Sequence, residues 1–253
     1  MSSITNWFEV YSPNVASAVS FYRDVFGWGT EPMPMGEGQE YTMLSGNTGP
    51  FSGIMDLTTP GMEHIPPHWG LYFHTPNCQA TATKVAELGG TLVYGPMDIP
   101  GIGIVAGFKD TLGAHFNVHQ PAADKPDMSG SPVNWVEHMG PDRAAAVEFY
   151  KALFGWGSMD MDMGEGVGIY SMFLDGETPS AGCMQVGAEA GPPAWMIYLH
   201  AENIGETLEK VAAAGGTVIQ PSMDIGEFGH IAIVQDAGGA FVGLHQPPVM
   251  ASV

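Results

Sequence analysis

The sequence Phe-Tyr-Arg-Asp-Val-Phe-Gly-Trp at residues 21–28 returns as Phe-Tyr-Lys-Ala-Leu-Phe-Gly-Trp at residues 149–156, an offset of 128 residues. The blocks before it keep the same step, because Asn-Trp-Phe-Glu at residues 6–9 corresponds to Asn-Trp-Val-Glu at residues 134–137. A residue that is kept in both copies has an equivalent structural environment in each of them. The chain is therefore expected to be an internal duplication, in which shared positions carry the structure and function.

The size and composition of the chain predict two globular domains. It has 253 residues, 45% of them hydrophobic, and each copy has the usual size of a domain with its own core. A segment rich in proline, serine and glycine separates the copies. We expect domain 1 at residues 1–121, a linker at 122–131 and domain 2 at 132–253.

The charge of the chain restricts its partners and its location. A net charge of −20 repels nucleic-acid phosphates and anionic membrane surfaces, so neither is an expected partner. No apolar run is long enough to span a membrane, and the N-terminus lacks a basic and apolar leader. Cys78 and Cys183 occupy non-equivalent positions, which favours two separate buried thiols. These features predict a cytoplasmic protein.

Each copy has the same predicted order of elements. In copy one, Ser12 is the expected N-cap of a helix with Pro13 at its first position, and Gly27 ends that helix. Asn77 caps a second helix, and a hairpin turn is expected at residues 36–38. In copy two, Asp142 opens the first helix. Expected strands are residues 6–11, 51–57, 69–74, 104–108, 114–119 and, in copy two, 240–245. The fold class is α+β.

This order resembles the vicinal oxygen chelate superfamily. The residues that carry the resemblance are the Phe-Tyr-x-x-x-Phe-Gly-Trp helix end, the Gly-Gly after the second helix and the Asp-x-x-Gly-Ala turn before the closing strand. The superfamily includes glyoxalase I, bleomycin-resistance proteins and extradiol dioxygenases, and the chain is similar to its tandem glyoxalase-like proteins labelled hydroxylase or 27 kDa antigen.

The resemblance implies two tandem domains of paired βαβββ modules, each a half-open barrel around one site. It implies a drug-sequestering module, or a lyase or hydroxylase/dioxygenase-type enzyme. It also implies a monomer, since two fused domains replace the family's usual dimer.

The resemblance also implies that the family's usual divalent metal site is absent. Metal-using members take ligands from four strands, and the matching positions in this chain lack ligating side chains at three of them. These positions are Trp7 and Trp135, the pairs Trp69-Gly70 and Trp195-Met196, and Asn117 and Gly243. Only Asp56 could ligate at the fourth. We expect no cofactor and no metal at these positions.

Three other polar positions are kept in both copies and alternate onto the same strand face. They are Glu9 and Glu137, His74 and His200, and His119 and His245. One hypothesis is a displaced Glu-His-His site for Fe, Zn, Mn or Ni. A second gives these side chains structural hydrogen bonds at strand ends. A third makes them ligand contacts, with Glu9 and Glu137 as general bases. The histidines present in one copy only, His64, His68, His115, His138 and His230, are expected to be surface or packing residues.

Aromatic and methionine side chains form the stronger signal. The chain has 17 methionines, a residue type that adapts to irregular apolar ligands but also fills gaps in cores. The candidate ligand-binding residues are Trp7, Met33, Met35, Trp69, Tyr72, His74, Asn117, His119, Trp135, Met161, Met163, Trp195, Tyr198, His200 and His245. The expected function is binding, or binding and processing, of a small apolar or dicarbonyl metabolite. A metal-dependent lyase or oxygenase and a ligand-free interaction protein are the alternatives.

Overall fold

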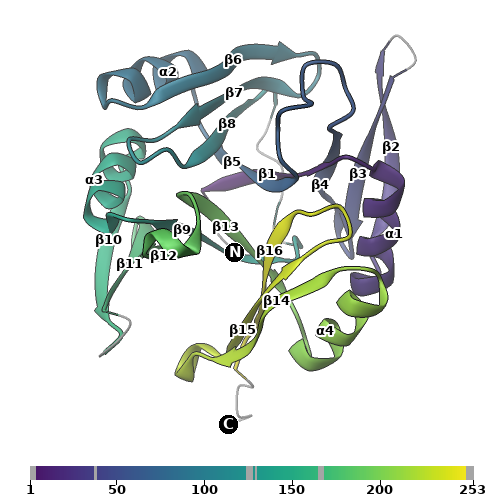
Figure 1. Cartoon of the computed structure of the whole chain (residues 1–253). Helices are drawn as coiled ribbons and strands as arrows, with labels where there is room; N and C mark the ends of the chain where they lie inside the picture. Colours follow the sequence, from purple (N-terminus) through teal and green to yellow (C-terminus); the bar gives the residue numbers. More distant parts are fainter. Residues whose placement is uncertain (1–3, 37–38, 124–127, 129, 165–167, 249–253) are drawn as a thin grey trace. The chain divides into compact units, whose positions relative to one another are not determined.

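The computed structural model describes residues 4–36, 39–123, 128, 130–164 and 168–248 (Figure 1). Copy one contains β1 (Thr5–Ser12), α1 (Val15–Phe26), β2 (Gly29–Gly36), β3 (Gln39–Gly46), β4 (Gly49–Asp56), β5 (His68–His74), α2 (Cys78–Glu87), β6 (Thr91–Ile99), β7 (Gly103–Lys109) and β8 (His115–Pro121). Copy two contains β9 (Val133–Gly140), α3 (Arg143–Phe154), β10 (Gly157–Asp162), β11 (Ile169–Asp175), β12 (Thr178–Gln185), β13 (Ala194–His200), α4 (Ile204–Ala213), β14 (Thr217–Asp224), β15 (His230–Gln235) and β16 (Phe241–Gln246). Short 3-10 helices lie at Ala188–Ala190 and Gly226–Phe228.

Each copy forms one eight-stranded mixed sheet. The strand orders are β2-β3-β4-β1-β5-β8-β7-β6 and β10-β11-β12-β9-β13-β16-β15-β14. In each half-sheet the first strand pairs in parallel with the last, as β1 does with β4 and β5 with β8. The remaining pairs within these half-sheets are antiparallel, which is the pattern of two βαβββ modules in succession. The α+β prediction with paired βαβββ modules is confirmed.

The helix ends show where local rules predict well and where they fail. Gly27 and Gly155 end their helices in the left-handed region, with φ of 73° and 74°, and Asp142 and Asn77 are N-caps as predicted. The prediction of Ser12 as the cap of α1 is wrong. Asn14 holds that place and accepts from the Ser17 amide at 3.0 Å. The Ser12 hydroxyl instead accepts from the Asn14 amide at 3.2 Å, so it supports the cap from outside the helix.

The strands were predicted close to their observed bounds, but β6 and its counterpart β14 were missed. Both carry exposed apolar side chains, including Leu92 and Ile219, and their registers shift at several points. Those shifts obscure the alternation that identifies a strand. The hairpin expected at residues 36–38 reaches residues outside the described part. No described helix is long and apolar enough to cross a membrane.

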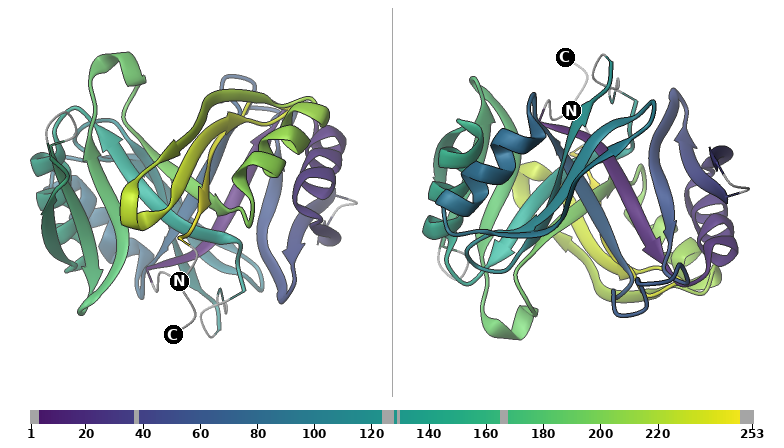
Figure 2. Two further views of the ribbon diagram at one scale, coloured as in Figure 1. Left: turned by 90° about the horizontal axis from the view of Figure 1, so that it is seen from below. Right: turned by 90° about the horizontal axis from the view of Figure 1, so that it is seen from above.

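The compact units of the structure combine modules from both copies. Unit 1 comprises Met1–Trp7, Gly70–Met128 and Trp135–Met196, and unit 2 comprises Phe8–Trp69, Ser129–Asn134 and Ile197–Val253. Unit 1 therefore holds most of the second module of copy one and the first module of copy two, and unit 2 holds the other two. Helices α2 and α3 pack in unit 1, and α1 and α4 pack in unit 2 (Figure 2). The two sheets are separated in the chain between Pro121, the end of β8, and Val133, the start of β9, whereas each compact unit joins segments of both copies.

The repeated helix motif joins the modules inside each unit. In unit 2, Trp69 Nε1 donates to the Tyr22 hydroxyl at 2.8 Å, which donates to Asp236 Oδ2 at 2.7 Å. In unit 1 the same chain runs from Trp195 through Tyr150 to Asp110, at 2.8 and 3.0 Å. Burial, followed by the charge of the neighbouring aspartate, raises the pKa of both tyrosines well above its ordinary value. Both hydroxyls therefore keep their protons and act as donors to an aspartate from the other copy.

Candidate functional site

A glutamate and a tyrosine meet on the first module of copy one, within unit 2. Glu9 on β1 is paired with Gly53 on β4, and its side chain is buried. Tyr41 on β3 donates its hydroxyl to Glu9 Oε1 at 2.7 Å. The carboxylate is thus held in one orientation on the strand face that was predicted to carry it.

A glycine makes room for this tyrosine in both copies. A Cβ at Gly53 would lie 1.8 Å from the Tyr41 hydroxyl oxygen. In unit 1 a Cβ at Gly182 would lie 1.8 Å from that of Tyr170, and Gly182 is paired with the buried Glu137. Any side chain at either glycine would displace the phenol. The tyrosine, glycine and glutamate are therefore one repeated structural element.

A tryptophan contacts the tyrosine in copy two. Trp135 Nε1 donates to the Tyr170 hydroxyl at 2.9 Å. Trp7 stands at the position of Trp135 in copy one. The predicted residues Trp135 and Glu137 thus share one strand face with Tyr170, with Trp135 in direct contact with its hydroxyl.

Methionines surround Glu137 and Tyr170 in unit 1. Strand register sets Met159 opposite Met172, and Tyr170 between Met161 and Met184. On the intervening positions, Asp160 and Ser171 hydrogen-bond to Arg143 of α3, so the methionines lie on the face away from that helix. The full set on this face is Met139, Met159, Met161, Met172 and Met184.

Copy one carries a smaller version of this face in unit 2. The register places Met33 opposite Tyr41 and Met43 opposite Gly53, and Tyr41 aligns with Met55. Of the predicted methionines, Met33 and Met161 lie on these faces. Met163 follows β10, where its amide donates to the Gly168 carbonyl at 2.9 Å. The side chain of Met35 lies outside the described residues.

The second module of copy one adds a polar cluster in unit 1. The Tyr94 hydroxyl donates to Asn117 Oδ1 at 2.9 Å, and Asn117 Nδ2 donates to the Leu71 carbonyl at 3.2 Å. Tyr72, paired with Asn117, has its hydroxyl 3.5 Å from that of Tyr94. In unit 2 the equivalent Tyr198 lies over Gly243, where a Cβ would be 2.3 Å from its ring. Tyr72 and Asn117, two of the predicted ligand-binding residues, thus lie side by side.

The paired histidines have hydrogen-bond partners in the protein. His119 Nε2 lies 3.1 Å from the Ile102 carbonyl, and burial lowers its pKa, which favours the neutral ring. His245 Nδ1 lies 2.8 Å from the Asn134 amide nitrogen, and its Nε2 lies 2.7 Å from the Phe228 carbonyl. By register, His74 pairs with His119 and His200 with His245.

The described side chains do not assemble a hard-ion site. Among residues 4–36, 39–123, 128, 130–164 and 168–248, no three His, Cys, Asp or Glu side chains gather as metal ligands. Both ring nitrogens of His245 are engaged, which leaves no lone pair for an ion without rearrangement. In copy two, a displaced Glu-His-His site for Fe, Zn, Mn or Ni would therefore require His245 to give up one of these hydrogen bonds.

The structure gives Trp69 and Trp195 a packing position. Each lies in the aromatic core of its unit, 6% exposed, with its indole N–H committed to Tyr22 or Tyr150. Their side chains therefore face the helices, not the strand face of the glutamates.

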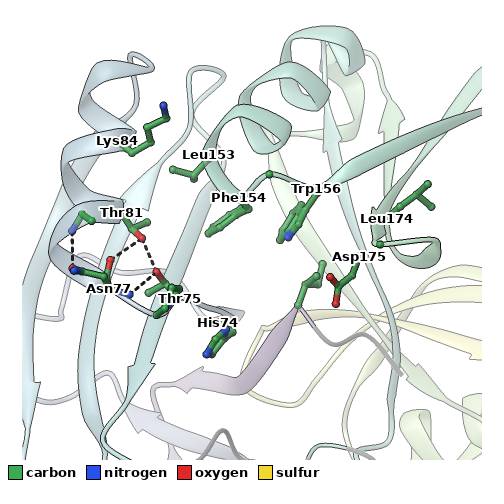
Figure 3. Close-up of a pocket in the computed structure, with 15 residues that line it drawn as sticks. His74, Thr75, Asn77, Thr81, Lys84, Leu153, Phe154, Trp156, Leu174 and Asp175 are labelled. Carbon is green, nitrogen blue, oxygen red and sulfur yellow. Dashed lines mark hydrogen bonds between the residues drawn. The ribbon is translucent and has the colours of Figure 1, made fainter.

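A separate pocket of about 560 Å³ lies in unit 1 (Figure 3). One side holds Phe154 and Trp156, whose rings stack 4.6 Å apart. The other holds α2 and the Thr75–Thr81 hydroxyl pair at 2.7 Å. His74 is the one predicted ligand contact among the residues that line it.

A buried Asp-His-Cys cluster occupies unit 1 beside Tyr150. His138 Nε2 lies 2.9 Å from Asp110 Oδ2, and its Nδ1 lies 3.8 Å from Cys183 Sγ. All three side chains are buried, and burial raises the pKa of Cys183 to about 12 and that of Cys78 to about 11. Cys183 therefore remains a thiol and is not an activated nucleophile. Both cysteines are free and buried, as predicted.

Several residues on these faces were missed from the sequence. Tyr41 and Tyr170, Met43 and Met172, Met55 and Met184, and Gly53 and Gly182 each repeat with an offset of 129, one more than the preceding blocks. A comparison of the copies that allowed this one-residue insertion would have found all four pairs. Tyr94 has Gln220 at its counterpart position, so no internal signal marks it.

Copy two matches a superfamily model, and the whole chain resembles named proteins. Residues 133–244 match the model of the Glyoxalase/Bleomycin resistance protein/Dioxygenase superfamily. The chain is 28% identical over 247 residues to "Putative glyoxylase CFP32" of Mycobacterium tuberculosis, covering 96% of this chain and 94% of that protein. It is 29% identical over 227 residues to "Anthracycline biosynthesis protein DnrV" of Streptomyces peucetius, covering 84% and 82%.

Solved structures show the same fold. The Mn(II)-bound glyoxalase from Novosphingobium aromaticivorans superposes with a TM-score of 0.63 at 13% identity, covering 97% of this chain and 82% of that one. The 2,3-dioxygenase LapB from Pseudomonas sp. KL28 gives 0.64 at 9% identity, covering 99% and 94%. The chain therefore has the paired βαβββ fold of these solved structures, and its residues 133–244 match the model of the Glyoxalase/Bleomycin resistance protein/Dioxygenase superfamily.

Proposed function

We propose that the chain binds a small, largely apolar molecule with a carbonyl or dicarbonyl group, without a divalent metal. The observation that carries this proposal is the buried Glu–Tyr–Gly element in a methionine-lined strand face, present once in each copy. A polar centre in an apolar surface orients a ligand, because buried polar groups need partners.

The side chains around the centre suit a ligand of this class. Thioethers are flexible and polarisable, so they adapt to an apolar outline. Trp7 and Trp135 occupy the strand position two residues before each glutamate, where an aromatic ring can stack on a planar ligand. The names of two relatives are consistent with this, since one is called a glyoxylase and the other an anthracycline biosynthesis protein.

The proposed chemical role of Glu9 and Glu137 is that of a general base toward a proton next to a carbonyl. The Tyr41 hydroxyl already donates to Glu9 at 2.7 Å and fixes its orientation. A sequestering module would use the same glutamates only as hydrogen-bond acceptors for the ligand.

A calorimetric and thermal-shift titration with 9-fluorenone and 1-phenyl-1,2-propanedione, in excess EDTA, tests binding without a divalent metal. We expect saturable binding, with a gain of ~2.7 kcal/mol in unfolding free energy at 100 times the dissociation constant. The variant Met43→Glu/Met172→Glu, which charges both strand faces, should lose this binding. Stabilisation that appears only after Mn(II) or Fe(II) is added would contradict the proposal.

The Glu9→Gln/Glu137→Gln double variant separates the two roles. An enzyme that uses the carboxylates as bases keeps its ligand affinity but loses turnover, with a loss of ~100-fold or more. A sequestering module shows no turnover in the wild type, and the same substitution changes only affinity. The measurement is product formation by NMR together with the titration above.

A further inference from the structure

Three methionines in unit 1 are grouped by strand register into one triangle. Met159 and Met161 lie on the same face of β10, and Met172 on β11 is directly opposite Met159. Directly paired residues have Cβ atoms ~5 Å apart, and residues two apart on a strand are separated by ~7 Å. Three rotatable bonds on each side chain then allow the three sulfur atoms to reach a common point.

The triangle is open to solvent on one side and closed on the other. Met159 is 45% exposed and Met172 is 9% exposed. An ion in solvent can therefore reach the thioether of Met159, whereas that of Met172 is almost fully covered by protein. The acidic neighbour Asp160 points to the opposite face, where it binds Arg143 at 3.0 Å. The residues of the triangle are thioethers, and the buried carboxylate on the same face, Glu137, lies two strands beyond Met172.

Copy one lacks this arrangement. The positions equivalent to Met159, Met161 and Met172 are Glu31, Met33 and Met43, and register again pairs Glu31 with Met43. Glu31 lies 3.4 Å from the Ser45 hydroxyl. Two thioethers and a carboxylate form a different ligand set, so the chain itself provides a matched comparison.

We infer that Met159, Met161 and Met172 form a binding site for one soft monovalent cation, Cu(I), with Ag(I) as its analogue. Thioethers are soft, uncharged ligands that select Cu(I) over the hard divalent ions preferred by carboxylates. The net charge of −20 raises the local concentration of cations around the protein. The site does not depend on the ligand-binding function proposed above, because its ligands are sulfur atoms and its occupant is an ion.

The test is a titration of the full chain with Ag(I), and with Cu(I) under anaerobic conditions, followed by NMR of protein labelled with 13C-methyl methionine. We expect the methyl signals of Met159, Met161 and Met172 to shift together as one ion binds among them. Substituting Met159→Leu, an exposed position that tolerates the change, should weaken Ag(I) binding by about tenfold or more. The triple leucine variant should lose the Ag(I)-binding step that accompanies the shift.

The matched control is Met33→Leu/Met43→Leu in copy one, which should leave Ag(I) binding unchanged. Because Cys78 and Cys183 are buried thiols that also bind Ag(I), the methyl shifts, not the stoichiometry alone, identify the site. Unshifted methyl signals at saturating Ag(I), or equal affinity in the Met159→Leu variant, would overturn the inference. A failure of the ketone titration would leave this result unaffected.

Discussion

At the residue scale, one aspartate in each unit organises the junction between modules. Asp110 Oδ1 accepts from the amides of Leu112 and Ala114, both at 2.9 Å, and its Oδ2 accepts from Tyr150 and His138. Asp236 Oδ1 likewise accepts from the amides of Gly238 and Ala240. Among the described residues, Tyr22 is the one side chain that donates to Asp236 Oδ2. The two junctions differ by a single donor, His138.

This difference predicts unequal costs for the two tyrosines. Tyr22→Phe leaves Asp236 Oδ2 without its donor and the Trp69 N–H without its acceptor, which should cost about 2–3 kcal/mol of unfolding free energy. Tyr150→Phe should cost less, about 1–2 kcal/mol, because His138 still donates to Asp110. Urea unfolding of both variants measures the costs, and an equal or reversed order would contradict this account.

The stability of unit 1 should also depend on pH through Asp110. Burial alone would raise the pKa of this carboxyl, but the hydrogen bond and charge of His138, with the amides of Leu112 and Ala114, leave it below its ordinary value. A carboxyl with a lowered folded-state pKa contributes stability that is complete above its unfolded pKa of ~3.9 and is lost as pH falls toward the folded value.

Asp110→Asn should therefore lower the melting temperature most above about pH 5, and the difference from wild type should shrink as pH falls to about 3. The lost hydrogen bonds cost the same at every pH, so the change in the difference is the diagnostic quantity. Scanning calorimetry between these pH values measures it. A constant difference would show that the Asp110 carboxyl does not titrate differently in the folded and unfolded states.

At the element scale, a strand glycine and a tyrosine on the neighbouring strand act together. Gly53 and Gly182 are ordinary strand positions by conformation, yet neither can accept a Cβ while the tyrosine stays in place. Their role is space, not backbone freedom. The polar centre of each strand face thus depends on a residue that has no side chain.

Gly53→Ala should destabilise the protein by about 1–3 kcal/mol, because Tyr41 must leave Glu9 or the strand must move. The control is Gly29→Ala on β2, where the nearest atom is 3.9 Å from the added Cβ, and that change should be neutral or slightly stabilising. Thermal unfolding compares the two. Equal effects at Gly53 and Gly29 would argue against the tyrosine as the cause.

The elements also show what sequence can predict. Caps, closing glycines and the order of strands follow from local rules, and Gly27, Asn77 and Asp142 lie where those rules place them. The side of the sheet on which a side chain lies was predicted less well. Trp69 was assigned to the ligand face, but its N–H meets Tyr22 on the helix side, a contact that depends on tertiary packing. Local periodicity contains no information about which module covers a strand.

At the scale of the whole molecule, each compact unit combines modules from both copies. The aromatic core of unit 1 includes Phe73 and Phe116 of copy one against Phe154 and Phe149 of copy two. In unit 2, a Cβ at Gly216 would lie 2.8 Å from Phe21, so the copies approach closely there as well. The repeat was visible in the sequence, but the pairing of its modules was not.

Neither half of the chain should fold stably as a monomer. Residues 1–121 and 132–253 expressed separately would each leave two aromatic module faces uncovered, and burying apolar surface is the main source of stability. We expect each half alone to aggregate or self-associate, and the two halves coexpressed to copurify as a 1:1 complex. Size-exclusion chromatography with light scattering measures this. A well-folded monomeric half would contradict the exchange of modules.

The methionine face of unit 1 has a further consequence, which concerns oxidative damage. Peroxide converts a thioether to a sulfoxide, which is polar and chiral, and reductases specific for each epimer reverse the change. Met159, the most exposed member of the face, would be converted before Met172. Exposure to peroxide would therefore make this apolar surface polar one methionine at a time. Reduction of the sulfoxides would restore the apolar surface without synthesis of new protein.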